Sequence, residues 1–451
     1  MKTPIKIIVV SDLRGSAGVE GAFPVAPGKT DALLEQLQPK LSLSPDKTVE
    51  IRSMEDFSLS RLKETLNLKE SSADEITKLL HNKAFQNAEA SWRGIEYLVS
   101  RLPEDGVCME VLDTPFEDVR KQVYDHVMKP EYEGKTEVPA TIILLDYDFS
   151  HKGETFEVFC DLAKMGEAIK APVVGQTTVG FFGMKHLLHL PTIQNPLERV
   201  MGQEHARYHE FRDTETAFWA SLMINRFLLR APYKEDGYEE PARADKPEQY
   251  LWGRGIWILG ANIIKSFSTK QHLVGISGLG TGGEQLGLPI RELPITRSEK
   301  VQTALEAPLP TDVVESLPYL GLSPLAQLPE EMGGQHQPSM IYLHLSGNMH
   351  KIPDPEEKQF GLLTVHTSLA YSLMLGRVSN LGWKYSEQLT STNPEDACAE
   401  LKKLLLDDLW HKEEDEIVIT PLENALRIEY NPYLVIHTRR FEISVDIPFG
   451  K

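Results

Sequence analysis

Residues 81–99 read HNKAFQNAEASWRGIEYLV and carry the clearest helical pattern of the chain. With the residues just before them, they place apolar side chains three or four positions apart: Ile76, Leu80, Ala84, Ala88, Trp92, Ile95 and Val99. That spacing predicts one long helix with a single buried face, and Ser72 or Asp74 can cap its start. We expect Trp92 to be buried against a sheet, and Arg93 to be an ion-pair or carbonyl partner rather than a catalytic group.

Strands and helices alternate on both sides of this segment. The β-branched run IKIIVV at 5–10 predicts a buried strand. Further strands are expected at 48–52, 107–112, 140–146, 172–177, 340–345, 425–430, 434–437 and 440–447. Helices are expected at 32–40, 117–127, 154–168, 252–267, 367–389 and 398–410. This alternation indicates an α/β fold, with a mixed sheet, flanking helices and a C-terminal β-hairpin.

The composition is that of an acidic globular protein. At about 150 residues per domain, the 451 residues suggest about three domains. The 47 basic and 66 acidic residues give a net charge of −19, which argues against binding to nucleic acid or to an anionic membrane. The three cysteines are too few and too widely spaced for a disulfide framework. We find neither a signal peptide nor an apolar run long enough to span a membrane, so we expect a cytoplasmic protein.

Two glycine-containing segments lack the features of a phosphate-binding loop. GKT at 28–30 has Phe23 where a P-loop has its first glycine, and prolines precede it. The glycine-rich run at 278–283 has no following lysine, and Glu284 would repel a phosphate. We therefore expect a tight structural turn at 278–283 and no nucleotide cofactor. The charged segment 234–248 is expected to be a surface loop.

The candidate metal and catalytic residues are also incomplete. His205 and His209 have the spacing of one helix face but lack the glutamate of a zinc-hydrolase motif, so solvated histidines are the default interpretation. Asp146 and Asp148 end a predicted strand and could bind magnesium, but no partner motif accompanies them. No GxSxG motif is present. The sequence therefore predicts no catalytic, cofactor-binding or metal-binding residues, and no enzyme.

A series of motifs in one order resembles the large sheath subunit of type VI secretion systems, TssC or VipB. The first is the helix at 81–99. The others are LDYDFSH at 145–151, FGM at 182–184, NRFLLRAPY at 225–233, YLWG at 250–253, ANI at 261–263, GG at 282–283, GLP at 287–289 and LGLSPL at 320–325. Asn225 stands where the family usually has proline. The resemblance implies the fold of a contractile tail sheath.

Residues 1–70 resemble a different protein of the same sheath, the small subunit TssB or VipA. The resemblance rests on IKIIVVSDL, on a helical segment from Asp31 that ends in LSLS, and on RSMEDFS at 52–58. The chain thus looks like a shortened small subunit fused to a large one, packed as one body. The expected divisions are 1–70 (small-subunit-like), 71–300 (large-subunit core), 301–410 (second core portion with an irregular insertion) and 411–451 (strand-exchange hairpin).

The resemblance implies a structural subunit of a contractile sheath in the bacterial cytoplasm. Its partners would be other TssB- and TssC-like subunits, an Hcp-like inner tube and a baseplate. In that family, N-terminal arms of neighbouring subunits add as strands to a C-terminal hairpin. The residues expected to carry packing and assembly are Trp92, Arg93, Phe227, Arg230, Tyr233, Ile428, Tyr430, Phe441, Ile443 and Val445.

Some features of the family have no counterpart in this sequence. The donor arms and the helix recognised by the ClpV unfoldase are missing, which argues against strand donation and against recycling by ClpV. A non-propagating cap, terminator or baseplate adaptor is therefore the alternative to a sheath subunit, and an enzyme is a remote one. Alternation over 424–447 predicts a surface hairpin with an unpaired edge and an apolar face that needs a partner. We expect the core to survive deletion of 438–451.

Overall fold

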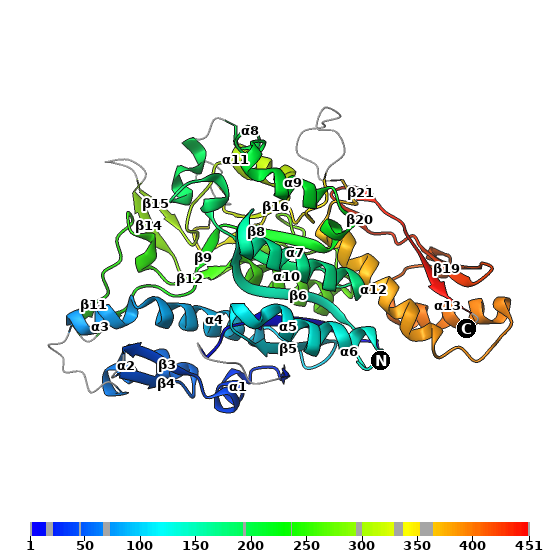
Figure 1. Ribbon diagram of the computed structural model, residues 1–451, viewed down its shortest axis with the longest axis horizontal. Helices are drawn as coiled ribbons and strands as arrows, with labels where there is room; N and C mark the ends of the chain where they lie inside the picture. Colours follow the sequence, from blue (N-terminus) through cyan, green and yellow to red (C-terminus); the bar gives the residue numbers. More distant parts are fainter. Residues whose placement is uncertain are drawn as a thin grey trace.

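The computed structural model describes residues 2–14, 21–44, 47–65, 73–192, 195–235, 237–294, 300–328, 337–351 and 364–449. Its centre is a nine-stranded sheet in the order β13-β17-β16-β8-β7-β6-β1-β5-β2 (Figure 1). The strands from β16 to β5 run parallel, and β2, β17 and β13 run antiparallel to their neighbours at the two ends. The strand bounds are β1 Ile5–Ser11, β2 Ala22–Val25, β5 Val107–Asp113, β6 Ala140–Phe149, β7 Val173–Thr177, β8 Ala220–Ile224, β13 Glu284–Gln285, β16 Leu322–Ala326 and β17 Ile341–Leu343. The predicted α/β fold is confirmed.

Strand β1 lies in the interior of this sheet, between β5 and β6. Its side chains alternate between two apolar cores: Ile5, Ile7 and Val9 enter one, and Ile8 and Val10 enter the other. The first core is shared with α4 (Lys83–Val99), α10 (Gly255–Lys270) and α12 (Leu369–Ser386), and the second with α5 (Val119–Val123) and α7 (Gly153–Ala168). The prediction that residues 1–70 pack on the following region is therefore confirmed for β1.

The helical pattern before residue 99 forms two helices rather than the one that we predicted. Helix α3 spans Ala73–Leu80, and α4 begins at Lys83. The Asn82 side chain accepts hydrogen bonds from the amides of Ala84 (3.0 Å) and Phe85 (3.2 Å). Such an N-cap satisfies the free amides at the start of a helix. A second helix therefore begins here, although the apolar spacing continues across the break.

Trp92 on α4 is fully buried, as predicted. Its indole Nε1 donates a hydrogen bond to the carbonyl of Leu13, two residues after β1 (3.1 Å). Arg93 pairs with Glu89 on the same helix (2.8 Å), which confirms the expected ion pair. Helix α4 is thereby fixed to the end of β1.

The rest of the N-terminal segment lies along α3 and α4 (blue in Figure 1). It consists of α1 Thr30–Leu37, β3 Lys40–Ser44, β4 Lys47–Glu50 and α2 Leu59–Thr65.

The helix predicted at 117–127 continues through a π-helical turn, Tyr124–Met128, into α6 Lys129–Tyr132. Smaller elements then follow: α8 Pro196–Val200, α9 Ala206–Arg212, β9 Arg226–Leu228, β10 Lys234–Glu235, β11 Tyr238–Glu239, β12 Trp252–Arg254, β14 Arg291–Pro294, β15 Lys300–Thr303 and α11 Thr311–Ser316.

The C-terminal part stands at one end of the molecule's long axis (orange and red in Figure 1). Here α13 (Pro394–Asp408) precedes an antiparallel sheet in the order β18-β19-β22, formed by Ile417–Pro421, Ala425–Tyr430 and Ile443–Pro448. The short strands β20 (Val435–Ile436) and β21 (Arg439–Arg440) pair with each other. We did not predict β18. Among all the described segments, no helix has the length and apolar character to cross a membrane.

Removal of β1 should prevent the fold from forming. A chain of residues 14–451 loses a strand with neighbours on both sides, and burying each of its Ile and Val side chains is worth about 1.5–3 kcal/mol. We expect this truncated protein to aggregate on purification. Urea unfolding followed by circular dichroism provides the check, and a soluble fragment with a cooperative transition would show that β1 is dispensable.

Trp92→Ala should lower the free energy of unfolding by about 3–5 kcal/mol, because it leaves a cavity against the end of β1 and frees the Leu13 carbonyl. Trp92→Phe, which keeps most of the ring volume, should lose less. The comparison is made by urea unfolding of the full chain. Equal losses for the two variants would mean that the packing volume at this position does not matter.

Candidate assembly site

The buried face of α4 carries a charged cluster together with apolar residues. Glu89 is fully buried, and its Oε1 accepts hydrogen bonds from Nε of Arg93 (2.8 Å) and Nε of Arg230 (2.7 Å). The Arg230 guanidinium also donates through Nη1 to Oε2 of Glu240 (2.7 Å). Two carboxylates and two guanidinium groups thus form one chain of ion pairs between α4 and the 225–240 region.

The charges in this cluster compensate one another. Burial alone would lower the pKa of Arg230, but Glu89 and then Glu240 outweigh it and hold that pKa above its ordinary value. Burial would raise the pKa of Glu240, but hydrogen bonding to His81 and the charge of Arg230 keep that pKa below its usual 4.5. Buried ions are tolerated when they are paired and hydrogen-bonded in this way.

Tyr233 connects this cluster to the N-terminal segment. The Arg230 guanidinium lies 4.0 Å from the centre of the Tyr233 ring. The Tyr233 hydroxyl donates a hydrogen bond to the carbonyl of Phe57, and burial raises the pKa of that hydroxyl to about 12. Residues 52–58, α4 and the NRFLLRAPY segment therefore meet at one point.

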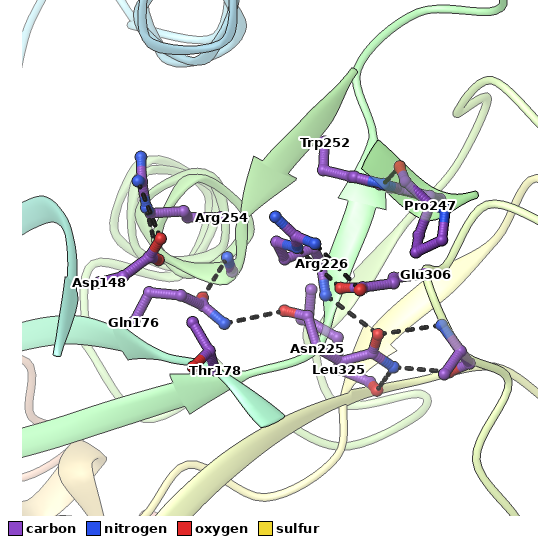
Figure 2. Close-up of polar contacts among 12 residues, drawn as sticks. Asp148, Gln176, Thr178, Asn225, Arg226, Pro247, Trp252, Arg254, Glu306 and Leu325 are labelled. Carbon is purple, nitrogen blue, oxygen red and sulfur yellow. Dashed lines mark hydrogen bonds and ion pairs between the residues drawn. The ribbon is translucent and has the colours of Figure 1, made fainter. Parts of the chain in front are cut away.

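A second polar contact joins the carboxyl ends of the central strands (Figure 2). Arg254, at the start of α10, donates to Asp148 of β6 (2.9 Å), as Figure 2 shows. It also donates to Asp146 of the same strand (2.8 Å). Asp146 also accepts hydrogen bonds from the hydroxyls of Ser11 in β1 and Ser91 in α4. The two aspartates that we considered as magnesium ligands thus hold an arginine and connect β1, β6, α4 and α10.

Asn225 occupies a bend that proline cannot adopt. Its φ is 74°, in the left-handed region, whereas the proline ring fixes φ near −65°. Its side-chain Nδ2 donates to the carbonyls of Ala307 (2.7 Å) and Leu325 (3.2 Å), as Figure 2 shows. Next to it, Arg226 and Glu306 form a two-pronged ion pair (2.7 and 2.9 Å). The departure from the expected proline is therefore matched by this backbone conformation.

His205 corrects one expectation. It is buried rather than solvated, and its Nε2 lies 2.8 Å from the carbonyl of Phe181. Its ring stacks on His151 at 4.0 Å, and burial lowers the pKa of both imidazoles. His209 contacts the carbonyl of Val200 (3.0 Å). In the part of the chain that the structure describes, no three His, Cys, Asp or Glu side chains gather as a metal site.

The glycine-rich segment packs as the predicted turn. Asn262 of α10 donates to the carbonyls of Ile276 (2.9 Å) and Gly283 (3.1 Å). A Cβ atom at Gly282 would lie 2.4 Å from the carbonyl oxygen of Gly275, so the close approach requires glycine. The amides of Gly278 and Gly283 donate to the carbonyls of Leu343 and Gly278, and the amide of Gly280 donates to the Glu284 carboxylate.

The C-terminal sheet differs from the predicted hairpin in two ways. Strands β19 and β22 do pair, but β18 covers the other side of β19, so the sheet has three strands. Its apolar face is not free either, because α12 packs on it. Five side chains that we assigned to this site lie on or beside that face, with Val445 half-buried and the others buried: Ile428, Tyr430, Phe441, Ile443 and Val445. A Cβ at Gly382 of α12 would lie 2.7 Å from Cδ1 of Ile428.

The C-terminal sheet leaves the outer backbone edges of β18 and β22 unpaired within the described residues. Among the described residues, β18 and β22 each form a ladder on one side only, with β19. Val418 on β18 and Ser444 on β22 point away from α12 and are exposed. An unpaired strand edge presents free amides and carbonyls to another chain. The edge, and not the face, is therefore the surface at which a partner strand can add.

Known proteins resemble the part of the chain that contains the charged cluster. Residues 65–332 match the family described as VipB, EvpB/VC_A0108, tail sheath N-terminal domain. The chain belongs to this family. It is also 24% identical over 241 residues to the type VI secretion system sheath protein TssC1 of Pseudomonas aeruginosa. That match covers 49% of this chain and 48% of the relative, so it spans about half the length of each.

Within this sheath-family chain, the matched region contains α4, Arg230 and the contacts of Figure 2. Strand β1 precedes it and the C-terminal sheet follows it. Phe227 is buried in the matched region, with its ring 5.8 Å from that of Tyr97. The structure brings Arg93, Arg230 and Tyr233 together, Trp92 lies on the same helix as Arg93, and the C-terminal residues form a separate site.

Sequence reasoning missed the acidic half of the cluster. Glu240 lies in the segment that we expected to be a surface loop, but it is buried against Arg230. Glu89 offered one signal, since it stands four residues before Arg93, the spacing of a helical ion pair. Nothing in the sequence alone pairs either glutamate with Arg230.

Arg230→Met should lower the free energy of unfolding at pH 7 by about 3–5 kcal/mol, because it leaves buried carboxylates without their partner. The lowered native pKa of Glu240 means that its contribution is present above pH 4.5 and is lost as the pH falls through that lowered value. The difference in free energy of unfolding between the unaltered chain and Arg230→Met should therefore become smaller below pH 4.5. Urea unfolding at a series of pH values measures the difference.

A matched control is Arg243→Met, which removes the exposed ion pair with Asp245. It should leave the urea midpoint of unfolding almost unchanged, because water and salt screen an exposed ion pair. A loss for Arg230→Met that is as small as the control, or that does not vary with pH, would contradict the assigned role of the cluster.

Proposed function

We propose that the chain is a structural subunit of a type VI contractile sheath, which surrounds an inner tube and ejects it by contracting. The observation that carries the proposal is the tail sheath family match over residues 65–332. The buried charges of this region support it, because they pair with one another and hold α4, β6 and α10 as a rigid body. A sheath transmits force through such bodies and through the contacts between them.

In this proposal, residues 1–70 act as a small-subunit-like segment fused to the large subunit. The position of β1 supports it, since this strand lies inside the sheet, between β5 and β6, and is supplied from outside the matched family region. We also retain the divisions 71–300, 301–410 and 411–451 as proposals. Covalent fusion would supply β1 to the sheet without a separate association step between two chains.

The proposed partners are neighbouring sheath subunits, which would add strands at the open edges of β18 and β22. An Hcp-like inner tube, a baseplate and the bacterial cytoplasm follow from the same family, and recycling by ClpV is not part of the proposal. The residues Ile428, Tyr430, Phe441, Ile443 and Val445 would then hold the acceptor sheet on α12 and leave its backbone edges available.

Negative-stain electron microscopy of the purified full chain tests the proposal. We expect long tubes. We expected the core to survive deletion of 438–451, but this deletion would remove the buried Ile443 and Ile447 and destabilise the core. Substitution at exposed edge positions avoids this difficulty. Monomers or single rings would contradict a propagating sheath and favour a cap or baseplate adaptor.

Val418→Lys combined with Ser444→Lys should abolish or shorten the tubes, because charged lysines on edge strands oppose strand addition. Both positions are exposed, so we expect unfolding to change by about 0.5 kcal/mol or less. The control carries lysine at two exposed apolar positions away from the sheet, Tyr132 and Met201. Tubes of normal length for the edge variant, or equal shortening for the control, would exclude strand addition at these edges.

A further inference from the structure

A surface cavity of about 360 Å³ lies between the end of the NRFLLRAPY segment and β14. Tyr233 and Glu240 line one side, and Tyr250, Ile290 and Arg291 line the other. This volume is near the lower limit of ligand pockets. It offers room for one or two side chains of a partner rather than for a large cofactor.

Arg291 is the unusual residue of this cavity. It is 5% exposed, and its guanidinium lies 4.6 Å from the ring centre of Tyr250 and 4.9 Å from that of Trp252. Nη2 donates to the carbonyl of Glu306 (2.7 Å). Nε and Nη1 are buried beside Tyr250, and no acceptor meets either of them at hydrogen-bond geometry. Burial lowers the pKa of Arg291. Polar contact with the Tyr250 side chain, the charge of that side chain and then the charge of Glu306 offset this only in part.

No carboxylate within the described residues pairs with Arg291, although several stand near it. Glu306 forms its ion pair with Arg226 (2.7 Å). The acidic side chains that line the cavity also form ion pairs with other residues: Glu239 with Lys234, Glu240 with Arg230 and Glu292 with Lys300. Arg291 is thus a buried cation that lacks an anion, in a wall where the anions have their own partners. A buried charge without a partner is costly, and a carboxylate that binds it in a two-pronged geometry removes that cost.

We propose that this cavity binds the carboxylate of a glutamate or aspartate side chain presented by a neighbouring sheath subunit. The inference rests on the proposed function for the identity of the partner, and on Arg291 for its chemistry. Planar guanidinium groups stacked on aromatic rings are well suited to recognise carboxylates, because the fork of donors stays fixed in direction.

The rim of the cavity favours a peptide over a free anion. Ile290 lines the cavity and is 38% exposed. This side chain can cover an apolar residue next to the bound carboxylate, whereas the glutamates in the walls oppose a multiply charged ion such as phosphate.

The position of the cavity also suits a contact between subunits. In Figure 1, β11 and β14 stand at one end of the long axis, and α13 and β19 at the other. The cavity and the open strand edges are thus different surfaces at opposite ends. Contacts between unlike surfaces repeat along an assembly, as a tube requires.

Isothermal titration calorimetry of the full chain tests the proposal with two probes, acetyl-Leu-Glu-Leu-amide and acetyl-Leu-Gln-Leu-amide. We expect the glutamate peptide to bind at least about tenfold more tightly, since only it can neutralise Arg291. Arg291→Met should remove this preference. Arg207→Met, a matched control that removes an exposed arginine paired with Glu157 outside the cavity, should retain it.

Equal binding of the two peptides, or no binding of either at millimolar concentration, would overturn the proposal. So would acetate binding as tightly as the glutamate peptide, because the site would then take a free carboxylate. If Arg291→Met does not fold, the comparison of the two peptides on the unaltered chain still decides. Tube formation is scored separately: a chain that forms tubes but shows no preference for glutamate refutes the cavity assignment alone.

Discussion

The fold depends on the pairing of β1 with β5 and β6 at the same time. The seven residues of β1 lie between β5 and β6, with buried side chains on both faces of the sheet. A parallel strand in this position needs both neighbours and both layers of helices in place before its burial is complete. The N-terminal segment and the sheath-family region therefore share one sheet and its two apolar cores.

Buried polar groups then fix how the helices sit on that sheet. Asp146 joins β1, α4 and α10 through Ser11, Ser91 and Arg254. Glu89 and Arg230 do the same for α4 and the NRFLLRAPY segment. Apolar packing alone tolerates small shifts and rotations, whereas an ion pair inside a core loses its compensation when its partners move apart. This arrangement favours a body that moves as a whole.

The sequence supported the α/β class because long periodic segments such as β1 and α4 depend mainly on local spacing. It did not separate α3 from α4, because the apolar spacing continues across Asn82 and the break comes from a side-chain cap. Glu240 was misassigned because a charged loop looks the same whether its glutamate meets water or a buried arginine. The covered face of the C-terminal sheet was missed for a similar reason, since α12 precedes it by more than thirty residues and no local pattern pairs the two. Contacts between distant segments are set by the tertiary fold.

In the C-terminal sheet, the apolar face is covered and the backbone edges are open. In the sheath that we propose, this difference would let a subunit keep its shape while the arrangement of its neighbours changes. Side-chain contacts are specific in position, so a sheet whose apolar face already packs on α12 gains nothing from a partner's apolar face. Backbone edges are different, because an added strand forms its hydrogen bonds with the edge alone and does not require the bodies behind the two strands to touch. A chain that closes its faces and leaves edges open can therefore remain linked to its neighbours while the rigid bodies rotate. For the sheath function that we propose, this combination would let contraction proceed without breaking the links between subunits.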